Sequence, residues 1–240
     1  MKIVVGNKNY SSWSLRPWLT AKVLGIPFDE VFMPFSGPNW QEKYRLLSPT
    51  GRVPVLIDGN LRIAESLAII EYLADKFPEK GVWPADILDR AVARSLSAEI
   101  HAGFLAIRGA APMNLRASHP DRVDLAAVEG DLKRFEKILA ERLKASGGPF
   151  MFGPFTAVDA MYAPLATRLE TYELPVSPAM REYMTLIFAL PAFKEWKMAA
   201  LREPWIVETD EIDFIQKKAA EAKAAMAQPA EAKAAPAPQP

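Results

Sequence analysis

The chain has 240 residues, no cysteine, and 29 basic and 29 acidic side chains. The lack of cysteine excludes disulfides, thiolate metal sites and cysteine nucleophiles, and it permits a reducing, cytoplasmic setting. The balanced charge gives no global field that would attract nucleic acid or an acidic membrane, and no apolar run reaches the roughly twenty residues of a membrane span. We therefore expect a cytoplasmic protein that needs neither nucleic acid nor a membrane as a partner.

The first part of the chain predicts alternating strands and helices in the order βαβ followed by ββα. This order is typical of a thioredoxin-like α/β domain. The clearest local signal is a hairpin across Asp58-Gly59-Asn60. The expected elements are strands over 2–6, 28–33, 53–57 and 61–63, helices over 12–24 and 65–77, and a partly helical connection over 34–47.

The first expected helix has a polar start and an internal proline. Ser12 or Ser14 is expected to cap its N-terminus, and Gly25 to follow its last residue. Pro17 is expected in the first turn, where the missing N–H of proline costs little.

The pattern changes after residue 78 to an all-helical period. Thr156-Ala157-Val158-Asp159 predicts a capping box at the start of a helix, with aspartate in the place where glutamate is usual. Pro164 predicts a kink in that helix. The expected helices cover 86–111, 121–146, 159–170, a segment from Ser177-Pro178 to before Pro191, and 192–201.

Residues 206–240 are expected to form a C-terminal extension. Its last part, Met226 to Pro240, contains only Ala, Pro, Lys, Glu, Gln and the starting Met. Such a segment lacks the apolar surface that repays the entropy of ordering. We therefore expect a disordered Ala/Pro-rich tail.

Two short runs at close spacing predict a binding site. In Pro49-Thr50-Gly51-Arg52-Val53-Pro54 a tight turn leads into a strand, and the bond before Pro54 is a candidate for the cis form. The backbone of Val53 would then be free to pair with a ligand. Glu65-Ser66 opens the next helix, and an ordinary helix cap is the alternative role for this pair. A hydroxyl, backbone N–H groups and a helix N-terminus beside a free strand edge favour a peptide-like ligand that carries a carboxylate.

These two runs resemble the cytosolic glutathione transferase family, where a Pro-x-x-x-Val-Pro turn precedes the third strand and Glu-Ser or Asp-Ser opens the next helix. The Thr156 to Asp159 cap also fits that family, so the resemblance covers roughly residues 1–205. It implies a thioredoxin-like glutathione-binding domain over 1–78, a linker over 79–85, and an all-helical domain over 86–205 that contributes the second-substrate pocket. It also implies glutathione as the cosubstrate, no metal, and a homodimer.

The loop after the first strand carries the expected catalytic residues. Without cysteine the chain cannot form a mixed disulfide, but a serine hydroxyl can donate a hydrogen bond to a bound thiolate and lower its pKa. Ser11-Ser12-Trp13-Ser14-Leu15-Arg16 resembles the serine-type classes, with zeta and theta features, and Trp13 stands where the zeta pattern has cysteine. Ser11 and Ser12 are equal candidates for the activating residue. Tyr10 is a third candidate, and helix capping is the alternative role for the serines.

The resemblance also assigns the parts of glutathione to residues. Val53, presented by the turn at Pro54, would pair its backbone with the cysteinyl part. Glu65 and Ser66 would hold the γ-glutamyl end. The glycyl end is expected to meet one of four residues: Trp40, Gln41, Lys43 or Arg52.

The second substrate is expected against the start of the helical domain. His101, Phe104 and Arg108 fall on one face of the expected helix over 86–111, and Tyr10 and Trp13 would face them from the catalytic loop. An arginine in an apolar pocket favours an acidic or carbonyl-bearing electrophile, whereas a solvated arginine and a satisfied histidine are the alternative. The two histidines of the chain are too few and too scattered for a metal site.

The expected function is that of a glutathione transferase, which adds the serine-activated thiolate to small apolar electrophiles. One alternative is a glutathione-dependent isomerase of the maleylacetoacetate isomerase kind, although Trp13 departs from the zeta pattern. The other is a non-catalytic binding or regulatory protein with the same fold.

Overall fold

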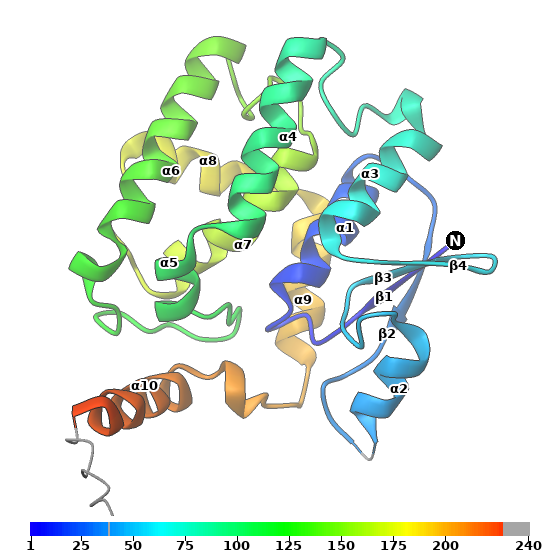
Figure 1. Cartoon of the computed structure of the whole chain (residues 1–240). Coiled ribbons are helices and arrows are strands. Elements are labelled where there is room, and N and C mark those ends of the chain that lie inside the picture. Colours follow the sequence, from blue (N-terminus) through cyan, green and yellow to red (C-terminus); the bar gives the residue numbers. More distant parts are fainter. Residues whose placement is uncertain (38, 228–240) are drawn as a thin grey trace, which may run out of the picture.

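A computed structural model describes residues 1–37 and 39–227. The chain begins with a four-stranded mixed sheet, to which an all-helical part is joined (Figure 1). The strand order is β2-β1-β3-β4, in which β1 pairs in parallel with β2 and antiparallel with β3, and β3 pairs antiparallel with β4. The predicted thioredoxin-like α/β order is therefore confirmed. The strands are β1 (Lys2–Val5), β2 (Asp29–Phe32), β3 (Val55–Asp58) and β4 (Leu61–Ala64).

Three helices belong to this first part of the chain: α1 (Ser12–Val23), α2 (Trp40–Leu47) and α3 (Ser66–Lys76). The central strand β1 is apolar, and burial of its side chains against α1 supplies much of the driving force for this layer. α1 is the shared element of the molecule, because it packs on β1 and α3 and also on α7 (Ala157–Thr171) and α9 (Pro191–Arg202).

The start of α1 differs from the prediction. Ser11, and not Ser12 or Ser14, caps the helix, because its Oγ accepts a hydrogen bond from the Ser14 N–H at 3.3 Å. The helix consequently begins at Ser12, and Pro17 is its sixth residue. Pro17 therefore lies in the helix interior and not in the first turn, and it removes one internal hydrogen bond.

The helical part is built around α7. Every residue of α7 except Glu170 is buried, and the helix packs on α1, α4 and α8. The predicted capping box at Thr156 and Asp159 is present. The remaining elements are the 3-10 turns η1 (Pro78–Lys80) and η2 (Glu208–Asp210), and the helices α4 (Ile87–Ala102), α5 (Leu105–Ala110), α6 (Leu125–Ser146), α8 (Pro178–Ala189) and α10 (Ile212–Ala227).

The helix expected over 86–111 is broken in two. A Cβ on Gly103 would lie 2.8 Å from the Glu99 carbonyl oxygen, and Phe104 takes a left-handed φ of 55°. The Arg108 guanidinium stabilises the break, because its Nη1 donates hydrogen bonds to the carbonyls of His101 and Gly103 at the end of α4, each at 3.1 Å. The single long helix was therefore a wrong prediction, since glycine allowed a turn that the helical period hides.

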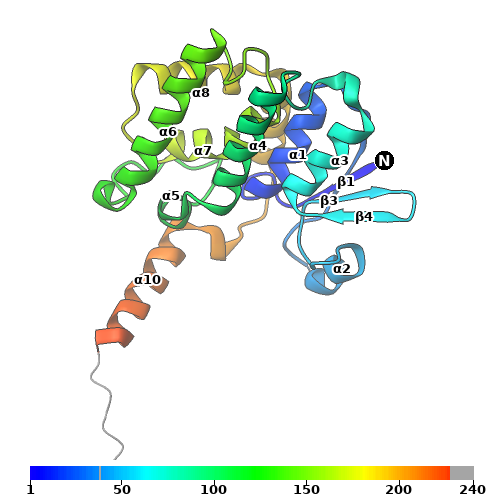
Figure 2. The same cartoon turned by 45° about the horizontal axis from the view of Figure 1, so that its top comes forward.

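The C-terminal extension also differs from the prediction in part. Residues 212–227 form α10, which extends away from the helical bundle (Figure 2). The Ala, Lys and Glu of this segment are strong helix formers, and the helix includes the first two residues, 226 and 227, of the segment that was expected to be disordered. The last part of the expected disordered tail, 228–240, lies outside the described residues. Within the described part of the chain, no helix is long and apolar enough to cross a membrane.

Candidate functional site

The loop between β1 and α1 presents two serines in different states. The Ser11 hydroxyl is engaged in two hydrogen bonds, because it caps α1 by accepting from the Ser14 N–H and donates to Ser14 Oγ at 2.7 Å. Ser12 is the first residue of α1 and lines the large cleft of the molecule. Its Oγ makes no hydrogen bond to any residue in 1–37 or 39–227. Within the described part of the chain, the Ser12 hydroxyl at the start of this helix therefore has no hydrogen-bond partner, in contrast to that of Ser11.

The third candidate, Tyr10, has its hydroxyl occupied by two partners. It donates to Glu211 Oε1 at 2.5 Å and accepts from Arg116 Nη2 at 2.9 Å. Burial, together with the hydrogen bond to Glu211, raises the pKa of Tyr10 above its usual value. The Tyr10 proton is thus directed at Glu211 and away from a ligand in the cleft.

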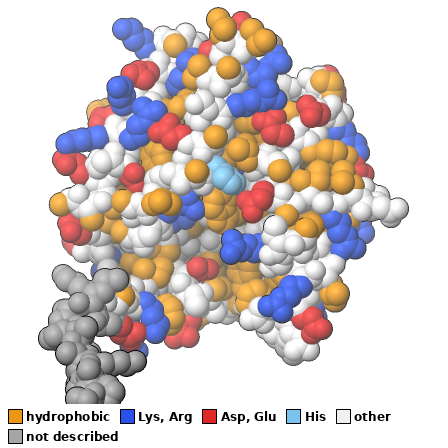
Figure 3. Space-filling model, in the orientation of Figure 1, with side chains coloured by type: hydrophobic (Ala, Val, Ile, Leu, Met, Phe, Trp, Pro, Cys, Tyr) orange, Lys and Arg blue, Asp and Glu red, His pale blue; other side chains and the backbone are white. Residues whose placement is uncertain are grey.

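The cleft has a volume of about 980 Å³ and adjoins a second cavity of about 320 Å³. The two share the wall residues Trp13, Thr50, Arg52, Val53 and Arg108. On the face drawn in Figure 3, histidine, acidic and basic side chains gather near the centre. The large cleft is lined by Tyr10, Ser11, Ser12, Trp13, Trp40, Gln41, Arg52, Val53 and Arg108 among others, and the smaller cavity adds Pro54, Glu65, Ser66 and His101.

Phe104 is the expected site residue that the structure does not bring to this wall. Its side chain is buried, and its ring contacts Tyr162 edge-on with the centroids 6.0 Å apart. Phe104 is the N-cap residue of α5 and takes a left-handed conformation there, unlike the helical conformation that was expected. Phe104 is therefore not among the residues that line these two cavities. Lys43 is likewise absent from the lining of the described cleft, whereas Gln41 is present.

The smaller cavity carries the expected features for a peptide-like ligand. The Val53–Pro54 peptide bond is cis, and Val53 lies just before β3. Glu65 precedes α3 with a φ of 73°, a conformation that is rare for a residue with a side chain and that concentrates at binding sites. The Ser66 hydroxyl is buried, and no partner for it occurs among the described residues. A buried hydroxyl of this kind is available to a ligand.

Trp13 lies between the two cavities with a concentration of positive charge around it. The guanidinium carbons of Arg16 and Arg108 lie 4.2 and 4.8 Å from the centroid of its ring, and the His101 ring meets it edge-on at 5.0 Å. Burial and the neighbouring Arg108 and Arg168 lower the pKa of Arg16 to about 9. Nη1 of Arg16 is buried without a partner in the described residues.

The same surroundings act on His101. Burial lowers its pKa below the usual value, and Arg16 and Arg108 lower it further, against the opposing effect of Glu65. The Glu65 carboxylate lies 3.7 Å from His101 Nε2. The lowered pKa favours the neutral form of His101.

The comparisons with known proteins agree with this geometry. Residues 10–76 match the family model of the glutathione S-transferase N-terminal domain, and residues 97–196 match that of the C-terminal domain. This chain belongs to the glutathione S-transferase family. Family membership supports glutathione S-transferase activity, with glutathione as the cosubstrate.

Three relatives illustrate the similarity. A probable maleylacetoacetate isomerase from Vibrio cholerae is 28% identical over 170 residues, which are 66% of this chain and 77% of that protein. Glutathione S-transferase 1 from Dianthus caryophyllus is 41% identical over 81 residues, only 34% of this chain and 36% of that protein. A glutathione transferase homologue from Burkholderia, solved with bound glutathione, has a TM-score of 0.63 at 25% identity and covers 84% of this chain and 98% of that one.

Two charged residues of this glutathione S-transferase site were missed by sequence reasoning. Arg168 of α7 lines the large cleft, and burial lowers its pKa to about 10. Asp210 of η2 also lines the cleft, and burial raises its pKa. Both belong to elements far from the catalytic loop in sequence, and no local pattern around either residue points to the cleft. No group of three or more His, Asp or Glu that could hold a metal occurs in the described residues.

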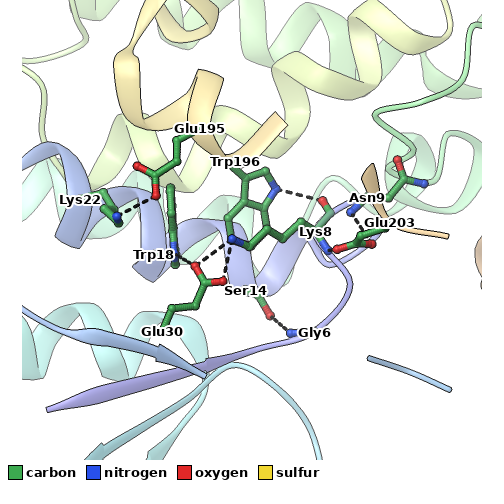
Figure 4. A network of polar contacts seen from close by, with 10 residues as sticks. All are labelled: Gly6, Lys8, Asn9, Ser14, Trp18, Lys22, Glu30, Glu195, Trp196 and Glu203. Atoms are coloured by element: carbon green, nitrogen blue, oxygen red, sulfur yellow. Dashed lines mark hydrogen bonds and ion pairs between the residues drawn. The ribbon is translucent and has the colours of Figure 1, made fainter. Parts of the chain in front are cut away.

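A partly buried polar network supports the loop between β1 and α1 (Figure 4). Lys8 pairs with Glu30 of β2 at 2.7 Å, and the Trp18 indole donates to the same carboxylate at 2.6 Å. Trp196 of α9 donates from Nε1 to the Lys8 carbonyl at 2.9 Å. This loop is thus held both by β2 of the sheet and by α9 of the helical part.

Proposed function

We propose that this protein is a glutathione transferase in which the Ser12 hydroxyl donates a hydrogen bond to the thiolate of glutathione. The observation that carries the proposal is the contrast within the loop. The Ser11 and Tyr10 hydroxyls are engaged by the protein, whereas Ser12 lines the cleft and its Oγ has no partner among the described residues. Of the three candidates, Ser12 is the one that can act without breaking an existing hydrogen bond.

The chemistry depends on the thiol pKa. A free thiol near pKa 8.5 is only a few per cent ionised at pH 7, and a downward shift of about two units makes most of it a nucleophile. A hydroxyl donor at the N-terminus of α1 stabilises the anion, because the helix end carries a partial positive charge. The buried guanidinium of Arg16 adds positive potential behind Trp13.

Glutathione would lie along the Val53 turn and reach the start of α3. The Val53 backbone would pair with the cysteinyl part, in the manner of an added strand. Ser66 Oγ would donate to the γ-glutamyl carboxylate, and the Glu65 carboxylate would face the ammonium group. The unpartnered Ser66 hydroxyl supports this orientation. The glycyl end would meet Trp40, Gln41 or Arg52 in the large cleft.

The second substrate would be a small apolar electrophile seated against Tyr10, Trp13 and Arg108. A glutathione-dependent isomerase is a second candidate function. The arginines at positions 108 and 168 favour an electrophile with a carboxylate, and the Vibrio cholerae relative is named a probable maleylacetoacetate isomerase. The two functions differ in stoichiometry, since a transferase consumes one glutathione per turnover and an isomerase regenerates it.

We also propose that the protein acts as a homodimer in the cytoplasm, as is usual in the family. The absence of cysteine suits a reducing compartment. Sedimentation equilibrium should give twice the chain mass of 26.6 kDa, and a single chain mass would contradict the dimer.

Calorimetric titration with two ligands tests the glutathione site. Glutathione is expected to bind, and cysteinylglycine, which lacks the γ-glutamyl group, is expected to bind at least about tenfold more weakly because Glu65 and Ser66 lose their partner. Equal affinities would contradict the assignment of Glu65 and Ser66. No binding of glutathione would contradict the proposed function.

A further inference from the structure

Glu203 follows α9 and lies buried beneath the catalytic loop (Figure 4). Its Oε1 accepts a hydrogen bond from the Lys8 backbone N–H at 2.5 Å. Its Oε2 accepts from Asn7 Nδ2 at 3.2 Å and from the Asn9 backbone N–H at 3.5 Å. Consecutive backbone N–H groups that converge on one anion fix the course of the backbone that carries them.

Short hydrogen bonds connect this contact to the serines. The Asn7 carbonyl accepts from the N–H groups of Tyr10 at 3.1 Å and Ser11 at 2.7 Å. The Tyr10 carbonyl accepts from the Ser12 N–H at 2.9 Å. The turn from Asn7 to Ser12 is therefore a single hydrogen-bonded unit, and a displacement at Lys8 and Asn9 is transmitted to Ser12.

Glu203 is itself held in place by Arg116. The Arg116 guanidinium donates from Nη1 to the Glu203 carbonyl at 2.6 Å, and the Arg116 backbone N–H donates to Asn9 Oδ1 at 2.9 Å. The same side chain donates from Nη2 to the Tyr10 hydroxyl. The backbone of Glu203 is therefore held by the helical part of the molecule, and its carboxylate is buried.

We propose that Glu203 is a positioning residue for thiol activation: its carboxylate sets the turn from Asn7 to Ser12, so that Ser12 Oγ lies where the glutathione sulfur binds. Glu203 does not line either cavity, so it acts through the loop and touches no substrate. The inference rests on the proposed function, because it assigns Ser12 its role. It adds that the geometry of thiol activation is set by a residue 194 positions away from Asn9.

The test is Glu203→Gln in the full chain, with Glu182→Gln as the matched control. Glutamine keeps the shape of the side chain, but its NH2 group cannot accept hydrogen bonds. It would face N–H donors that bind the carboxylate in the wild type, so the loop must move. Glu182 is exposed on α8 and has no hydrogen bond or ion pair among the described residues. Three quantities are measured: the pKa of bound glutathione from its thiolate absorbance, the separate values of kcat and KM for glutathione, and the thermal midpoint.

Glu203→Gln is expected to lower kcat about tenfold or more, since a misplacement of about 1 Å can cost a hundredfold. KM for glutathione should stay within about threefold, because Val53, Glu65 and Ser66 are untouched, and the thiol pKa should rise toward that of free glutathione. Glu182→Gln should match the wild type in all three measurements. If Glu203→Gln does not fold, Arg116→Lys, which weakens the hold on the Glu203 carbonyl, is expected to give the same split between kcat and KM.

A folded Glu203→Gln protein with the wild-type kcat and thiol pKa would overturn the inference, even if its thermal midpoint is lower, because Glu203 would then only stabilise the fold. An unchanged kcat and thiol pKa in a folded Arg116→Lys protein would overturn it in the same way. The proposed function fails separately: it is contradicted by a wild type that binds no glutathione, and that result would remove the inference with it.

Discussion

Replacement of Asp159 by alanine is expected to lower the free energy of unfolding by about 4 kcal/mol. The carboxylate is fully buried at the start of α7 and accepts hydrogen bonds from the Met151 N–H at 3.2 Å, the Thr156 N–H at 2.9 Å and the Tyr183 hydroxyl at 3.0 Å. Alanine leaves these three donors buried without an acceptor, and each loss costs about 1–3 kcal/mol. Disruption of a buried hydrogen-bond network is among the mechanisms that produce the largest losses of stability by single substitutions, above about 4 kcal/mol.

The assay is equilibrium unfolding in urea at pH 7, in which ΔG in water and the slope m are both determined. Tyr183→Phe removes one of the donors and leaves the others paired, so it is expected to cost only about 1 kcal/mol. A loss below about 1 kcal/mol for Asp159→Ala, at unchanged m, would refute the reasoning that this carboxylate holds the start of α7.

The same carboxyl makes stability depend on pH. Burial raises the pKa of Asp159 from its ordinary 3.8 to about 6 in the folded protein. Between these values the folded state binds more protons than the unfolded state, so this group's contribution to stability falls as pH rises from about 4 to about 6, by about 3 kcal/mol in all. The difference in unfolding free energy between the wild type and Asp159→Asn should follow this slope, and a slope of opposite sign would contradict it.

Two further predictions concern the glutathione site. Ser66→Ala is expected to raise the Kd of glutathione about tenfold without lowering the thermal midpoint, because Ser66 Oγ is buried and has no partner in the described residues; calorimetry and thermal unfolding check this, and an unchanged Kd would contradict it. Tyr10→Phe is expected to keep kcat within about threefold of the wild type, because the Tyr10 hydroxyl is directed at Glu211; steady-state kinetics that show a loss of a hundredfold would transfer the activating role to Tyr10.

The features that the sequence predicted well are those with a local signature. The hairpin at Asp58-Gly59-Asn60 depends on the turn residues between the two strands, which are adjacent in the sequence. The capping box at Thr156 and Asp159 depends on a three-residue spacing, and it is present. The runs at Val53-Pro54 and Glu65-Ser66 each have a local pattern, and the fold brings them together in one cavity.

The features that the sequence did not predict depend on contacts between distant segments. The break at Gly103 is invisible in a pattern that keeps its helical period on both sides. The partners of the catalytic loop, Glu203 and Glu211, are remote from it in sequence and have no motif of their own. Our proposal of Ser12 over Ser11 likewise needed the structure, because it is based on which hydroxyl caps the start of α1.

The most direct test of the central claim is the pKa of the bound glutathione thiol, measured from thiolate absorbance in the wild type, Ser12→Ala and Ser11→Ala. The wild type is expected to hold this pKa about two units below the free value of about 8.5, and Ser12→Ala to return it toward that value while glutathione still binds. Ser11→Ala should lose about 1 kcal/mol of stability with its helix cap but keep the low thiol pKa. A low thiol pKa in Ser12→Ala, with its loss in Ser11→Ala, would contradict the assignment and make Ser11 the activating residue.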